Sequence, residues 1–228
     1  MKAAALTLVV ALSLSASAFA QQEPRNEREY RDEYDQLTVG LRNSIPTGIA
    51  TNGVRWGDLI SSGIGIELQY QELSRANSWI YGGWYAGVAA DSFGGRSVTL
   101  VDAATGLSTD ARTHRLNTAD VEFGGRLRQN LSGFHVDESV GAGAVMYMKQ
   151  EMDIRNGGPK NLEFIKSTPN YLFDLGVRLG APIGKDVELG LGFSFLVNGA
   201  PAHGKDFPGL HFRPQENLVF GLTLDFGF

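Results

Sequence analysis

The 228-residue chain contains no cysteine. This absence excludes a disulfide framework and any chemistry that depends on a thiolate. After the first 20 residues the chain also lacks an apolar run of the roughly 20 residues that a membrane-spanning helix needs. Basic residues are in the minority, since removing Lys2 leaves 19 basic against 25 acidic residues, a formal charge of −6. No basic stripe is available to neutralise phosphates, which excludes nucleic acid as a partner.

The first 20 residues have the pattern of a secretory signal peptide. The segment MKAAALTLVVALSLSASAFA carries one charge, then an apolar run, and ends in the small-residue pattern Ala18-Phe19-Ala20. The alternative, a retained membrane anchor, needs a longer apolar segment. We therefore predict a signal peptide at residues 1–20, with cleavage before Gln21. Residues 21–35 are dense in charge of both signs and predict a flexible N-terminal extension.

From residue 36 onward, apolar residues alternate with small or polar residues. A period of two predicts strands that each have one apolar face. Eight such segments occur, at residues 36–43, 63–73, 78–90, 117–130, 134–149, 169–181, 187–198 and 217–228. Links of a few residues alternate with long loops between them, and the short links are typical of antiparallel hairpins.

These features predict one all-β domain at residues 36–228, an eight-stranded antiparallel up-and-down transmembrane β-barrel. In such a barrel short periplasmic turns alternate with long extracellular loops, and the apolar outer face meets lipid. A soluble barrel of the lipocalin type has the same alternation with the two faces exchanged. Charges of both signs on the predicted inner face favour the membrane, as does a predicted aromatic girdle of Trp79, Tyr81, Phe226 and Phe228 near the short turns.

The last segment, NLVFGLTLDFGF, resembles the signature that outer-membrane proteins present to their barrel-assembly machinery. The residues that carry this resemblance are Phe220, Leu222, Leu224, Phe226 and Phe228. In plan, the chain after the signal peptide is similar to small eight-stranded barrels of the OmpA transmembrane-domain, OmpX and OmpW type. The resemblance implies the outer membrane of a Gram-negative bacterium, with the assembly machinery and periplasmic chaperones as partners during biogenesis. The resemblance of the last segment indicates how the barrel is assembled, and it does not indicate an activity.

The predicted inner face carries a set of charged residues. An eight-stranded barrel is only just wide enough for side chains to fill it, and buried charges need partners. We predict a lumenal charge network of Glu67, Glu122, Arg126, Arg128, Asp174, Arg178, Glu188 and Asp225. Its three arginines are expected to pair chiefly with Glu67, Glu122 and Asp174 and so to plug the lumen. Inward glycines leave an alternative open, a narrow porin-like pore or an OmpW-like path for small hydrophobic solutes.

Catalysis is a third alternative. Outer-membrane lipid A deacylases resemble this chain in size and strand number, and they carry a His-x-Ser pair on their seventh strand. The corresponding segment here, FSFLVNGA, contains no histidine, so Ser194 has no nearby base. We therefore expect no enzymatic activity and no cofactor.

The fourth long loop holds the candidate ligand contacts His203, Lys205, His211 and Arg213. Outer-membrane lipids, the phosphates of lipopolysaccharide or an unidentified extracellular ligand are the partners considered for them. The two histidines are eight residues apart and match no tight metal-ligand spacing, so no metal site is predicted. The plain alternative is a solvated loop without a ligand. The sequence thus favours a structural or surface-interaction barrel.

Overall fold

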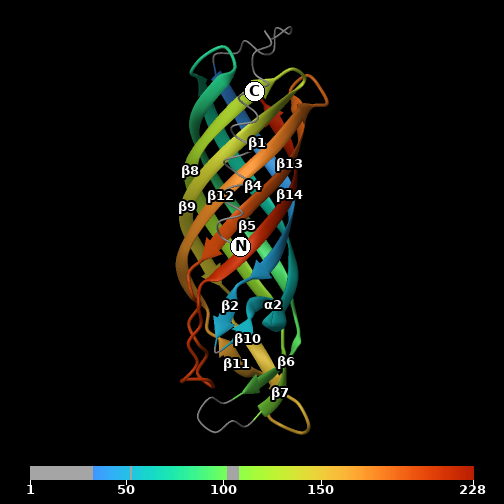
Figure 1. Cartoon of the computed structure of the whole chain (residues 1–228), viewed down its shortest axis with the longest axis vertical. Coiled ribbons are helices and arrows are strands. Elements are labelled where there is room, and N and C mark those ends of the chain that lie inside the picture. Colours follow the sequence, from blue (N-terminus) through green and yellow to red (C-terminus); the bar gives the residue numbers. More distant parts are fainter. Residues whose placement is uncertain (1–32, 52, 102–107) are drawn as a thin grey trace.

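The chain folds into one tall barrel with a smaller folded region at one end (Figure 1). The computed structural model describes residues 33–51, 53–101 and 108–228. The predicted signal peptide lies outside the described residues, as does most of the predicted extension. Within the described ranges, no helix is long and apolar enough to cross a membrane.

Eight antiparallel strands close the barrel in the order β1-β14-β13-β12-β9-β8-β5-β4. Their bounds are β1 Glu33–Thr47, β4 Ile60–Arg75, β5 Ile80–Gly95, β8 Leu116–Leu131, β9 Phe134–Tyr147, β12 Thr168–Pro182, β13 Val187–Asn198 and β14 Gln215–Gly227. Each strand pairs with the next barrel strand along the chain, and β14 returns to pair with β1 over residues 36–47 and 216–227. The predicted eight-stranded up-and-down barrel is therefore confirmed.

Short turns gather at one end of the barrel, which we name the turn end, and long loops gather at the other, the loop end (Figure 1). The tightest turn is Ser132-Gly133, where Gly133 has a φ of +87°. Such a left-handed conformation is unstrained only for glycine among the common residues. Six of the eight barrel strands extend one to five residues further at the loop end than the alternation predicted, β9 ends two residues earlier, and β1 begins three residues earlier.

Each strand has one face toward the lumen and one toward the surroundings, as a period of two requires. On β4, for example, Ile64 is 72% exposed, and on β13 Leu191 is 62% exposed. By contrast, the inward Arg128 of β8 and Asp225 of β14 have no exposed surface. An exterior of isoleucine, leucine, valine and phenylalanine over a polar interior is the arrangement that hydrocarbon requires, and the reverse of the lipocalin alternative.

The aromatic residues near the turn end differ in part from the prediction. Tyr70, Trp84 and Phe228 form contacts on the outer face, with ring centroids of Tyr70 at 5.5 Å from Trp84 and 6.4 Å from Phe228. Tyr81, predicted in this girdle, is fully buried and packs edge-on against Tyr34 at 4.7 Å. The prediction for Tyr81 was wrong because small residues blur the alternation on β5.

The long loops fold into a structure of their own beyond the barrel (Figure 1). It comprises a four-stranded sheet in the order β11-β10-β7-β6, a two-stranded sheet of β2 and β3, and a single helical turn, α2. Their bounds are β2 Ile49–Thr51, β3 Val54–Arg55, α2 Trp56–Leu59, β6 Ser97–Val101, β7 Ser108–Thr113, β10 Gln150–Ile154 and β11 Leu162–Ile165. We name these elements, together with residues 199–214, the loop cap.

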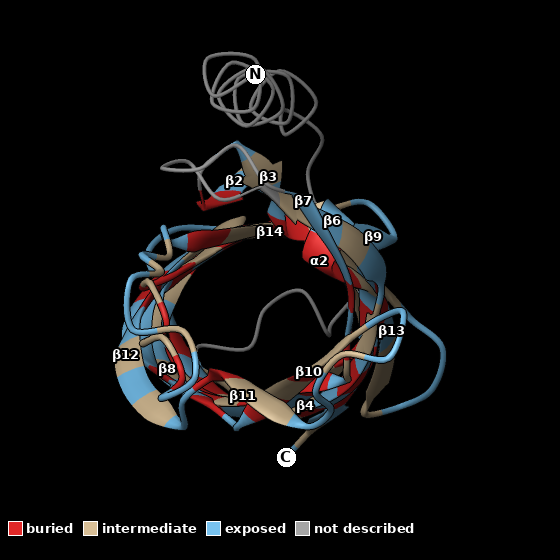
Figure 2. Cartoon of the chain, turned by 90° about the horizontal axis from the view of Figure 1, so that it is seen from below, coloured by how far each residue is buried: buried red, intermediate tan, exposed pale blue. Residues whose placement is uncertain are grey.

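Seen along its axis, the barrel is a closed ring of strands with the loop elements arranged around the rim of its loop end (Figure 2). Backbone hydrogen bonds tie the loops together: Lys166 donates to Ala202, Gly204 to Phe164, and Arg213 to Ala50. Three separate loops therefore hold one another in place at this end.

Candidate functional site

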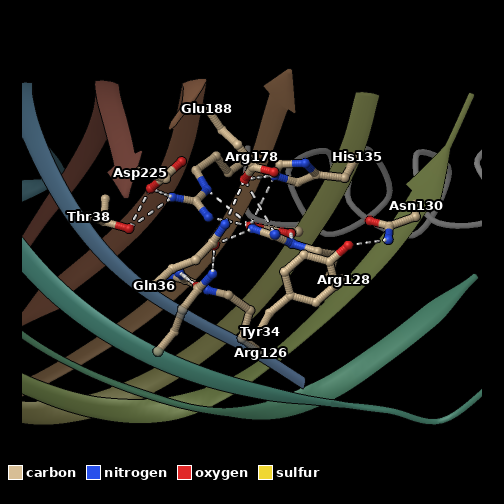
Figure 3. Close-up of polar contacts among 12 residues, drawn as sticks. Tyr34, Gln36, Thr38, Arg126, Arg128, Asn130, His135, Arg178, Glu188 and Asp225 are labelled. Atoms are coloured by element: carbon tan, nitrogen blue, oxygen red, sulfur yellow. Dashed lines mark hydrogen bonds and ion pairs between the residues drawn. The ribbon is translucent and has the colours of Figure 1, made fainter. Parts of the chain in front are cut away.

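A charge network lies in the lumen near the turn end (Figure 3), and Asp137 is its centre because it contacts both Arg128 and Arg178. Arg128 donates to both Asp137 carboxylate oxygens, at 2.8 and 3.0 Å. Arg178 donates to Asp137 at 2.5 Å and to Asp225 at 2.6 Å. Glu188 lies 3.4 Å from Arg128. We name these five residues the turn-end network.

Strand register explains why these residues meet. Arg128 of β8 lies directly opposite Asp137 of β9, and Asp137 lies directly opposite Arg178 of β12. Three neighbouring strands thus place a cation, an anion and a cation in one row across the lumen. Directly opposed side chains are the closest neighbours in a sheet. In this row Arg128 donates to both oxygens of the Asp137 carboxylate, and Arg178 donates to one of them from two nitrogens.

The predicted pairing of the arginines with Glu67, Glu122 and Asp174 was wrong. Register places Glu67 opposite Gly40, Glu122 opposite Gly143, and Asp174 opposite Gly141. No arginine stands across from these acids, and no ion pair joins them to any residue that the structure describes within 4 Å. Asp137, which takes their place, was missed by the sequence reasoning, although it shares the inward parity of its strand.

Arg126, the third predicted arginine, is held by amides and an aromatic ring. It donates to Gln69 at 2.8 Å and also to Gln71, which itself donates to Gln36. Its guanidinium lies 4.5 Å from the ring centre of Tyr85, a distance at which a cation is attracted to the ring face. Arg126 therefore belongs to the lumen filling without forming an ion pair among the described residues.

A second ion-pair group, which the sequence reasoning missed, lies closer to the loop end. Arg42 of β1 donates to Asp91 at 2.9 and 2.7 Å and to Asp120 at 2.5 Å. All three side chains are buried. The signal was present in the sequence, because Arg42 follows the outward Leu41 and so shares the inward face.

Between these two groups lies a small polar cavity of about 70 Å³. Its charged lining residues are Glu67, Glu122, Asp174, Arg42, Arg126 and Arg178. Gln69 donates to Glu122 at 3.2 Å. The cavity is large enough for a few water molecules, since about 10–15 Å³ of such space holds one. Ser194 lines it, but no histidine is among its lining residues. A serine–histidine pair is therefore not assembled among the residues that line this cavity.

Neighbouring side chains occupy the space beside several inward glycines. A β-carbon at Gly141 would overlap the Tyr85 hydroxyl, and one at Gly180 would overlap the His135 ring. A β-carbon at Gly40 would likewise overlap the carboxylate of Glu67. The absence of a side chain at these positions accommodates a large side chain from a neighbouring strand.

Apolar side chains from the loops and from the barrel strands pack together at the loop end. Trp56 of α2 is fully buried, stacks on Phe212 at 5.6 Å, and donates from Nε1 to the Pro214 carbonyl at 3.2 Å. Phe164 of β11 packs edge-on against Phe207 and Phe212. Barrel residues such as Tyr147 and Leu196 join the same cluster. We name this cluster the mouth core.

The predicted ligand residues of the fourth loop are separated by this packing. His203 is half-buried, pairs with Ile165 of β11 as a β-bridge, and lies with Nδ1 3.1 Å from the Gly204 carbonyl. Lys205, His211 and Arg213 are exposed, while Phe207, Leu210 and Phe212 of the same loop turn inward. In the described part of the chain, no group of three histidine or acidic side chains is placed to hold a metal ion.

The surface of the loop cap carries its own ion pairs. His114 lies 3.1 Å from Asp153, and Lys149 lies 2.6 Å from Glu151. The backbone amide of Asn161 donates to Asp153 at 2.8 Å and, with His114, holds the pKa of Asp153 below its ordinary value. The hydrogen bond and charge of Glu151 raise the pKa of Lys149.

Several solved outer-membrane proteins are similar to this chain in fold. Ail, the attachment invasion locus protein of Yersinia pestis, aligns at 12% identity with a TM-score of 0.47, covering 87% of this chain and 100% of Ail. The outer-membrane protease OmpT from Escherichia coli aligns at 8% identity with a TM-score of 0.43, covering 86% and 96%. Neisserial surface protein A aligns at 13% identity with a TM-score of 0.29, covering 85% and 97%.

No protein-family model and no curated protein matches the sequence. The class of the fold is evident from the chain itself, because its sheet closes on eight strands with an apolar exterior and a charged interior. This is the architecture of a small outer-membrane β-barrel.

Proposed function

We propose that the protein is a structural or surface-interaction barrel of the outer membrane whose lumen is sealed by its own side chains. The observation that supports this function is closure at two levels. The turn-end network crosses the lumen near the turns, and the mouth core fills the opposite end. A solute would have to break buried ion pairs and unpack aromatic rings to pass.

The proposal extends to location. A signal peptide at residues 1–20 would export the chain, and the apolar exterior would retain it in the outer membrane, with the turns toward the periplasm. Lipopolysaccharide is the proposed surface partner, through Lys205 and Arg213 on the exposed part of the fourth loop. Outer-membrane fractionation of cells and heat-modifiable migration on gels test the location and the closed barrel together.

Planar-bilayer recording of the purified full chain tests the seal. We expect no steady conductance at low voltage, because the proposed seal blocks the lumen near both ends. A steady conductance of reproducible size would overturn the sealed-lumen function in favour of the narrow-pore alternative. Mass spectrometry of lipid A from a deletion strain tests the enzymatic alternative, and an unchanged lipid A profile is the expected result.

A further inference from the structure

A second cavity lies at the turn end of the barrel, on the outer side of the turn-end network. Its volume is about 110 Å³. Residues of two hairpin turns line it, the turn Ser132-Gly133 and the turn at residues 183–186. The start of β1 and the end of β14 complete its wall. We name this cavity the turn-end pocket.

Backbone geometry holds the walls of the turn-end pocket in place. The Gly184 amide donates to the Val187 carbonyl at 3.1 Å, and the Gly227 amide donates to the Asp186 carbonyl at 2.9 Å. On the other side, the turn between β8 and β9 closes through Gly133, whose φ is +87°. Walls that are fixed before binding reduce the cost of ordering a site around its ligand. The pocket is therefore preformed.

The inner wall of the turn-end pocket carries a buried polar atom without a partner. His135 lines the pocket and is only 3% exposed, and its Nε2 has no hydrogen-bond partner among the described residues. The Asp137 and Glu188 carboxylates lie 3.7 Å from this nitrogen, beyond hydrogen-bond distance (Figure 3). Buried polar side-chain atoms are nearly always hydrogen-bonded. The unpaired imidazole nitrogen therefore indicates that the pocket holds a hydrogen-bonding molecule.

Two opposite charges of the lining are available to such a molecule. The Oε2 atom of Glu188 accepts from Gln36 at 2.8 Å and from Arg128 at 3.4 Å, whereas Oε1 accepts from no described residue. The Glu188 side chain is 19% exposed. Lys185, in the turn before β13, is exposed and forms no ion pair within the described ranges. One carboxylate oxygen and one ammonium group therefore line the same pocket without partners there.

The size and the remaining lining of the pocket define the ligand further. A volume of about 110 Å³ corresponds to roughly seven to eleven water-sized groups at about 10–15 Å³ each. Leu131, Pro182 and Val187 add apolar surface. Asp186, the remaining carboxylate of the lining, takes part in an interaction of its own. A small molecule with an ammonium group, a carboxylate and a short apolar group fits these three kinds of lining.

We propose that the turn-end pocket binds an α-amino acid with a small apolar side chain, such as valine. Its ammonium group donates to the free oxygen of Glu188 and to Nε2 of His135, and its carboxylate accepts from Lys185. Hydrogen bonds between charged groups are stronger than those between neutral groups. This binding site goes beyond the sealed-barrel function, and only its access from the periplasm rests on the orientation proposed above.

Solution NMR titration of the purified full chain in detergent micelles tests the site. The probes are valine, isobutylamine, which lacks the carboxylate, and 3-methylbutanoate, which lacks the ammonium group. Valine should shift the amide signals of Gly133 and Gly184, one in each turn of the pocket. Loss of a hydrogen bond to a buried charge weakens binding about tenfold, and loss of an exposed ion pair at most about fivefold. We therefore expect 3-methylbutanoate to bind about tenfold and isobutylamine about fivefold more weakly than valine.

Two variants assign the contacts to their residues. Glu188→Gln keeps the shape of the side chain and should bind valine about tenfold more weakly, with no remaining preference for valine over 3-methylbutanoate. Lys185→Gln should lose the preference for valine over isobutylamine. Glu72→Gln and Lys166→Gln remove exposed charges outside the pocket and should bind valine as the wild type does.

Several results would overturn the site. They are valine titrations that leave the Gly133 and Gly184 signals unshifted, unchanged valine affinity in Glu188→Gln, and equal losses in the control variants. Heat-modifiable migration checks that each variant folds. Lys185 is exposed, so Lys185→Gln keeps the test decisive if Glu188→Gln does not fold. Bilayer conductance is independent of these outcomes, so failure of the amino-acid site is distinguishable from failure of the seal.

Discussion

The two ends of this barrel are filled in different ways. Near the turn end, strand residues alone fill the lumen, and their inward side chains are charged and paired. At the loop end, residues from all four long loops pack together, and these side chains are apolar. A barrel strand contributes to the lumen only the side chains of its inward face. A loop that folds back over the strand ends can also place aromatic rings there. The comparison indicates that the turn end depends on register and the loop end depends on contacts between loops.

The largest effect is expected from Asp137→Ala in the turn-end network. The change leaves Arg128 and Arg178 buried without their shared carboxylate, and breaking a buried pair costs about 3–5 kcal/mol. Urea unfolding in detergent micelles should show this loss as a lower midpoint. Glu188→Gln is the matched control, because Glu188 is partly exposed and 3.4 Å from Arg128. Equal midpoints for the two variants would remove Asp137 from the centre of the network.

A somewhat smaller effect is expected from Trp56→Ala in the mouth core. Replacing a fully buried tryptophan leaves a cavity and costs about 3 kcal/mol at the lower end of the usual range. The loop cap should become sensitive to protease while heat-modifiable migration of the barrel persists. Trp79→Ala serves as the control, because Trp79 is a half-buried tryptophan at the turn end. Loss of the barrel together with the cap would show that the two ends unfold as one unit.

The smallest effect is expected from the surface pair of the loop cap. The pKa of Asp153 is lowered in the folded protein, so its contribution is present above the ordinary value of 3.8 and is lost as the pH falls through the lowered value. Hydrogen exchange at the Asn161 amide should therefore show an extra acceleration of opening in that acidic range. Asp153→Asn should remove the pH dependence. An unchanged acid profile in this variant would exclude Asp153 as its source.

The eight strands, and the faces of all of them but β5, were predictable from the sequence because a lipid-facing barrel imposes a period of two along its strands. The alternation along each strand places Arg128, Arg178, Glu188 and Asp225 on the inward face. It does not show which residues of neighbouring strands lie opposite one another, since that depends on the register between the strands. The predicted partners Glu67, Glu122 and Asp174 fell opposite glycines for this reason.

The loop cap was not predictable in the same way. Its sheet joins residues from two loops, and Trp56 reaches Phe212 across more than half of the chain. No local pattern encodes such contacts, because the segments are short and only their neighbours give them a buried face. His203, Phe207 and Phe212 occur in one loop, yet only their packing reveals which of them join the mouth core.

The seam between β1 and β14 has a consequence for how the molecule is made. Twelve residue pairs join the earliest barrel strand to the latest, so neither edge is satisfied while the chain is still emerging. An open sheet of this kind has unpaired backbone groups on its two edge strands, and these edges can pair with other copies of the chain. Productive insertion must therefore wait for the final strand, and a chaperone that shields the growing hairpins until then would act on kinetics and leave the finished fold unchanged.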